Sequence, residues 1–112
     1  MYKVVFHIDE TTKVGLGLKN IENLLIDLGA DNVEVELVVN AEAITMLAAN
    51  NNENASRIAD LAAKGAKFAA CANAMKAFTL TKEEMLPQAI VVPSGAGELT
   101  KKQNDGFGYI RP

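Results

Sequence analysis

Cys71 is the only cysteine of the chain, and its position suits sulfur chemistry. It follows the apolar run 66–70 and precedes residues with a helical pattern, so we expect the thiol at a strand-to-helix junction. The partial positive charge and free N–H groups of a helix N-terminus favour the thiolate, which is the nucleophilic form of cysteine. A buried structural cysteine is the alternative, because free cysteine is among the most buried residue types.

His7 is the only histidine and a candidate partner for this thiol. It could act on Cys71 as a base or as an imidazolium, provided that the ring lies within hydrogen-bond reach. Because His7 stands in an apolar run, a core histidine with one backbone hydrogen bond is the other interpretation. Asp9 and Glu10 follow, either as acid–base or substrate-binding groups or as capping residues of the next helix.

Three further residues are candidates for substrate binding. Asn73 would lie in the first turn of the helix after Cys71, where it could bond a ligand or cap the helix. Ser94 and Gly95 open a turn that resembles a small anion-binding loop at a helix N-terminus. This turn lacks the length and the lysine of a phosphate-binding loop, and no GxGxxG motif is present. We therefore expect no nucleotide cofactor, and the absence of metal-ligand spacing predicts no metal site.

The elements that position these residues alternate between short apolar runs and helical patterns. Strands are expected at 2–8, 33–39, 66–70, 89–92 and 107–110, with helical segments at 14–28, 41–49, 55–64, 72–78 and 95–104. This alternation predicts parallel βαβ units with helices on both faces of the sheet. We expect one domain over 1–112, a three-layer α/β/α fold with a doubly wound, mainly parallel sheet of about five strands.

Ligands of such sheets bind beyond the carboxyl ends of the strands. The segments 7–10, 71–73 and 93–95 each fall at this edge. If their strands are neighbours, the three segments share one crevice.

The run 33–39 alternates valine and leucine with Glu34 and Glu36. One face of this strand is therefore apolar and the other acidic. The pattern predicts a half-exposed strand near an edge of the sheet, or an acidic face that meets a partner.

Composition excludes several classes of protein. The 112 residues are 49% hydrophobic, which is sufficient for one core, and a single cysteine forms no intrachain disulfide. The net charge of −3 and the lack of a basic stretch argue against nucleic acid as a partner. No segment resembles a signal peptide or approaches the roughly 20 apolar residues of a membrane span, so we expect a cytoplasmic protein with no membrane contact.

Four segments together resemble the DsrE/DsrF-like family of small sulfur-metabolism proteins. They are VFHID at 5–9, FAACAN at 68–73, VVPSGAGEL at 91–99 and QNDGFGYI at 103–110, and they cover nearly the whole chain in order. Two positions depart from the usual pattern. Ala72 replaces a small polar residue or glycine, and Phe107 replaces a common tryptophan, but neither change removes a reactive group.

The resemblance implies a doubly wound, flavodoxin-like fold and a homo-oligomer, commonly a trimer or hexamer. It also implies that Cys71 accepts sulfur as a persulfide and passes it on. Because the chain has no second cysteine, the acceptor would be a partner protein, a neighbouring subunit's thiol or a small thiol. The alternative is a non-catalytic oligomeric module that binds a small anion or metabolite at Ser94 and Gly95. An assembly subunit that acts through its acidic strand is a third hypothesis.

Overall fold

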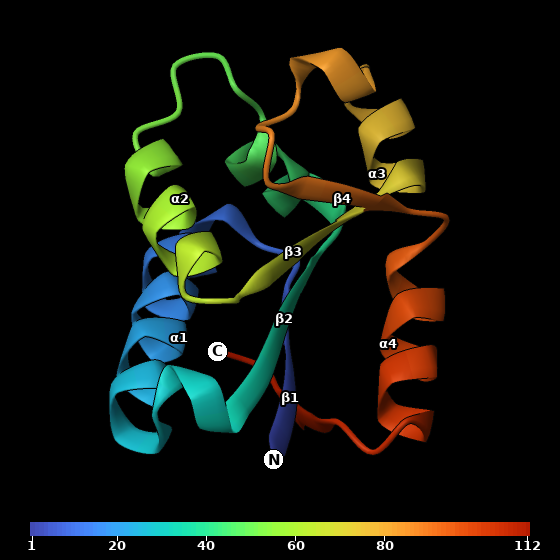
Figure 1. Cartoon of the computed structure of the whole chain (residues 1–112). Coiled ribbons are helices and arrows are strands. Elements are labelled where there is room, and N and C mark those ends of the chain that lie inside the picture. Colours follow the sequence, from blue (N-terminus) through green and yellow to red (C-terminus); the bar gives the residue numbers. More distant parts are fainter.

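Five parallel strands form one sheet in the order β4-β3-β2-β1-β5 in the computed structural model, which describes residues 1–112 (Figure 1). The predicted fold class is therefore confirmed, and each predicted strand lies within one residue of its observed bounds. The strands are β1 Tyr2–Ile8, β2 Val33–Val39, β3 Lys67–Cys71, β4 Ala89–Val92 and β5 Gly108–Ile110.

The helices are α1 Val14–Leu28, α2 Ala55–Ala63, α3 Ala72–Ala77 and α4 Gly95–Asn104. Short 3₁₀ turns occupy Thr11–Lys13, Ala30–Asn32, Ala41–Leu47 and Lys82–Glu84. The segment predicted as a short helix at 41–49 is thus a 3₁₀ turn. It starts at Ala41 in the left-handed region, with φ of 50°, and it ends before an extended Ala48.

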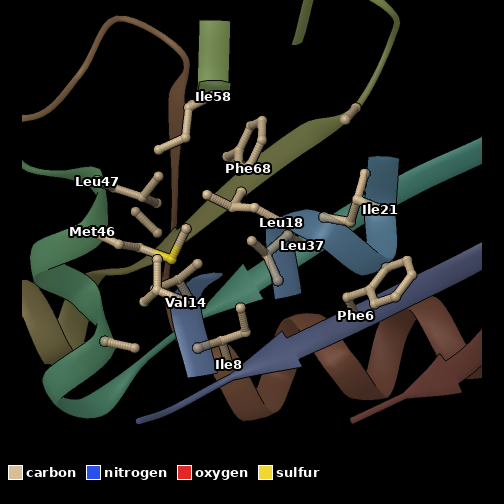
Figure 2. Packing of buried hydrophobic residues seen from close by; sticks show 14 of the residues in the cluster. Phe6, Ile8, Val14, Leu18, Ile21, Leu37, Met46, Leu47, Ile58 and Phe68 are labelled. Carbon is tan, nitrogen blue, oxygen red and sulfur yellow. The ribbon is translucent and has the colours of Figure 1, made fainter. Parts of the chain in front are cut away.

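Two apolar layers hold the sheet between its helices. The larger layer joins one face of the sheet to α1, α2 and α3. Figure 2 shows Phe6 and Leu37 on the side of Leu18 and Ile21, and Phe68 beside Ile58. α1 packs closely on β1 in this layer, because a Cβ at Gly17 would collide with the Ile8 side chain. The smaller layer lies on the opposite face and packs against α4. α4 connects β4 to β5 at the far edge of the sheet, and this crossover places β5 beside β1 (Figure 1).

The position of β2 corrects one prediction. β2 is the central strand of the sheet, so the prediction of an edge strand is wrong. Its acidic face is covered by α4 of the same chain, and Glu36 is only 5% exposed. Alternation along a strand identifies a polar face, but it does not reveal whether a distant helix covers that face.

None of the helices combines the length and the apolar character needed to span a bilayer.

Candidate functional site

The strand order determines which predicted site residues are neighbours. Cys71 pairs with Val92 of β4, so the segment 93–95 adjoins the end of β3. β1, which carries His7, is separated from β3 by β2. Neighbouring strands lie about 4.8 Å apart, which places β1 roughly 10 Å from β3. The carboxyl edge therefore has two parts, the end of β3 and β4 and the end of β1 and β5.

Cys71 occupies the strand-to-helix junction that the sequence indicates. It is the last residue of β3 and the N-cap of α3, with extended backbone at φ of −67° and ψ of 119°. The side chain is 5% exposed and belongs to the larger apolar layer. Its sulfur makes no hydrogen bond with any other group of the chain. Reaction at this thiol therefore requires a local movement that admits the reagent.

Asn73 is the polar residue nearest to Cys71 along α3. Its side chain is exposed and makes no hydrogen bond, so it does not cap the helix. The amide is consequently free to bond a molecule that approaches the end of β3.

Ser94 and Gly95 form the first turn of α4, where both have structural roles. The hydroxyl oxygen of Ser94 accepts a hydrogen bond of 2.9 Å from the N–H of Gly97, which is the geometry of an N-cap. Gly95 is buried, and a Cβ at this position would lie 3.0 Å from the Cβ of Asn40. A bound anion would therefore compete with the cap for this turn.

His7 belongs to a different cluster at the end of β1. Its Nδ1 lies 2.9 Å from the hydroxyl of Tyr109, and its Nε2 lies 3.0 Å from Oδ1 of Asn40. Because an amide oxygen only accepts, Nε2–H is the donor to Asn40, and in the neutral ring Nδ1 accepts from Tyr109. Both ring nitrogens are occupied, and neither bonds Cys71. Sequence reasoning missed Tyr109 and Asn40, since only the pairing of β5 with β1 brings Tyr109 to His7.

Asp9 lies at the same end and binds the C-terminal segment. Arg111 donates two hydrogen bonds to its carboxylate, at 2.8 and 3.3 Å. These bonds hold the pKa of Asp9 below its ordinary value, so the carboxylate is ionised and paired at neutral pH. No three histidine, cysteine, aspartate or glutamate side chains converge as metal ligands would.

A polar cleft of about 500 Å³ opens between the first turn of α1 and the loop 50–54. None of the predicted site residues lines it. Asn52 has a structural role in this loop, because its amide donates to the carbonyls of Met46 and Ala48 and accepts from the N–H of Asn54.

Comparisons with known proteins agree with this architecture. The family model described as the DsrE/DsrF-like family matches residues 3–112. The protein of unknown function MTH1491 from Methanobacterium thermoautotrophicum superposes with a TM-score of 0.92 at 33% identity, over 100% of both chains. A conserved protein of unknown function from Bacteroides thetaiotaomicron, BT1422, has the same fold, with a TM-score of 0.76 at 12% identity over 98% of this chain and 94% of that one. No match to the chain is found among curated proteins.

Proposed function

The chain belongs to the DsrE/DsrF-like family, and from this membership we propose that it is a sulfur-relay protein that carries sulfane sulfur on Cys71. The family assignment indicates a role related to sulfur metabolism. The observation that supports Cys71 as the carrier is its position, since the only thiol of the chain lies at the carboxyl end of β3, the edge where ligands bind in this class of sheet.

The proposed step is a thiolate attack on a persulfide donor, RS–SH. The Cys71 thiolate bonds the outer sulfur, the donor S–S bond breaks, and the products are Cys71–S–SH and the donor thiolate RS⁻. Transfer onward repeats the same exchange, with an acceptor thiolate attacking the outer sulfur of the Cys71 persulfide. Atoms and charge balance at each step, and no external oxidant or reductant takes part.

The burial of Cys71 determines how this exchange proceeds. A side chain that is 5% exposed is protected from water and oxidants, and its persulfide would share that protection. Entry and exit of sulfur require movement of α3, which has six residues and no side-chain cap. The free amide of Asn73 is the group that would meet a donor at this opening.

The acceptor must lie outside the chain itself, because no second cysteine is present. A partner protein, a small thiol, or Cys71 of a neighbouring subunit in a homo-oligomer would serve. In each case the sulfur leaves by intermolecular exchange and not by formation of an internal disulfide.

Intact-mass spectrometry after incubation with a low-molecular-weight persulfide tests this proposal. We expect a mass gain of one sulfur atom in the wild-type protein, and its complete loss in Cys71→Ser, whose hydroxyl has nearly the same size. The single cysteine makes this comparison free of background from other thiols.

The same donor applied to urea-unfolded protein is the control for thiol competence. If the unfolded protein takes up sulfur and the folded protein does not, the proposal is overturned. The binding-module function, in which Cys71 is structural, would then be favoured. A sulfur adduct that persists in Cys71→Ser would overturn it as well.

A further inference from the structure

Glu36 is the one buried residue with a charged or polar side chain. It lies on the central strand β2, on the face that α4 covers. One carboxylate oxygen, Oε1, lies 3.7 Å from Nζ of Lys102, which is too long for a hydrogen bond. The other oxygen, Oε2, is buried and has no hydrogen-bond partner. An ionised carboxylate is therefore poorly satisfied in this position.

The groups around Glu36 come from three elements. On the neighbouring strands, Lys67 of β3 and the apolar Val5 of β1 lie directly beside it in register. From α4, Lys102 and Glu98 face it. The ammonium of Lys102 also lies over the Phe107 ring, at 4.9 Å from the centroid, so it is not directed at Glu36 alone.

Glu98 lies one helical turn before Lys102 on α4, and no hydrogen bond joins its carboxyl to Oε2 of Glu36. An ionised Glu36 would keep both oxygens without a donor at hydrogen-bond distance, because the Lys102 ammonium lies 3.7 Å away. Protonation removes the charge from this buried carboxyl, and with it the cost of burying an ionised group. We propose that Glu36 is protonated in the folded protein, and that loss of this proton weakens the docking of α4 on the sheet.

The electrostatics of the site agree with this geometry. Burial and the Glu98 carboxyl raise the pKa of Glu36 to about 7, from an ordinary value of 4.5. Weaker docking of α4 would also affect the candidate site. The first turn of α4 follows the segment beside Cys71, and its Gly95 packs on Asn40. The proposal itself does not depend on the sulfur-relay function.

A titration of the glutamate carboxyl carbons by NMR, in isotopically labelled wild-type protein, measures the proton directly. We expect the Glu36 resonance to titrate near neutral pH, and the amides of α4 to shift or broaden with the same midpoint. Titration of Glu36 in the ordinary range of about 4 to 5 would overturn the proposal.

The pH dependence of stability gives an independent measurement. Because the folded-state pKa of Glu36 exceeds the unfolded-state value, its contribution is fully present below the unfolded value and is lost as the pH rises towards 7. We expect the unfolding equilibrium constant of the wild-type protein to rise on the order of tenfold or more between pH 5 and pH 8.

Glu36→Gln should abolish most of that rise, because its amide is uncharged at every pH. Glu34→Gln, on the same face of β2 but half-buried, is the matched control and should keep the wild-type dependence. His7→Gln identifies any contribution from the histidine, the residue type that ordinarily titrates in this range. A rise in Glu36→Gln as steep as in the wild-type protein would overturn the proposal.

Discussion

The two parts of the carboxyl edge differ in how their polar groups are satisfied. At the end of β3 and β4, Cys71 lies among apolar side chains and makes no hydrogen bond. At the end of β1 and β5, His7 and Asp9 are held by Tyr109, Asn40 and Arg111 at hydrogen-bond distance. The first part keeps its thiol without a hydrogen-bond partner, whereas in the second part His7 and Asp9 each bond other polar side chains. We therefore expect the reactive thiol at the end of β3 and β4, which is the part of the edge with fewer polar contacts.

The largest expected effect comes from removing the apolar support of the thiol. Phe68→Ala deletes a fully buried side chain of β3 and should lower the free energy of unfolding by about 3–5 kcal/mol. The loosened layer should also expose Cys71, so its alkylation by a maleimide should accelerate. Denaturant unfolding and alkylation kinetics measure the two effects.

Ile90→Ala is the control for Phe68→Ala, because Ile90 on the adjacent strand is 49% exposed. Its cost should be well below that of Phe68→Ala. Equal costs for the two substitutions would mean that β3 does not depend on the larger apolar layer.

Ser94→Ala tests whether the turn beside Cys71 is a cap or an anion site. Loss of the N-cap bond to Gly97 should cost about 1 kcal/mol of stability, whereas Ser94→Gly should cost only a few tenths. The measurement is denaturant unfolding with and without added phosphate or sulfate. Stabilisation of the wild-type protein by these anions, lost in Ser94→Ala, would contradict a purely structural role.

Arg111→Ala breaks the ion pair at the other part of the edge and should have a smaller effect. The two side chains are 48% and 32% exposed, so solvent screens their attraction and we expect only a small loss of stability at neutral pH, below that of Ser94→Ala. The pKa of Asp9 is lowered in the folded protein, so this contribution is present above its ordinary pKa of 3.8 and disappears as the pH falls through the lower folded value.

We would measure the free energy of unfolding of wild-type protein and of Arg111→Ala from neutral to strongly acidic pH. This comparison tests whether the contribution of the ion pair is lost in acid. The two curves should converge in acid. Arg57→Ala, whose partner Glu22 lies 3.8 Å away, is the control for loss of an exposed arginine. A gap between wild type and Arg111→Ala that stays constant to acid pH would rule out the ion pair as its cause.

The helices and strands themselves were predictable from the sequence, but which of them lie side by side was not. Apolar runs and the glycine at position 29 locate β1 to β5 and the end of α1 within one or two residues, because strand and helix periods are local properties. Strand order depends on which runs pair, and no local pattern encodes that β5 lies beside β1. The contact of Tyr109 with His7 spans 102 residues for this reason. Burial of Glu36 likewise depends on a distant helix, α4.

The smallest expected effect concerns His7, and it decides whether the two parts of the edge act separately. His7 bonds Tyr109 and Asn40, and a whole strand separates it from Cys71. His7→Gln should therefore leave the rate and the pH profile of Cys71 alkylation unchanged. Tyr109→Phe, which removes only the hydroxyl that contacts His7, should leave them unchanged too.

A shifted pH profile in His7→Gln would contradict this separation. Within one chain the two side chains have no contact, so such a shift would place His7 of one subunit beside Cys71 of another in a homo-oligomer. Mixing Cys71→Ser with His7→Gln subunits distinguishes the cases. If the site is shared across subunits, a mixed assembly contains one interface with both wild-type residues and recovers the wild-type profile. If the site lies within one chain, every thiol in the mixture belongs to a His7→Gln subunit, and the shifted profile persists.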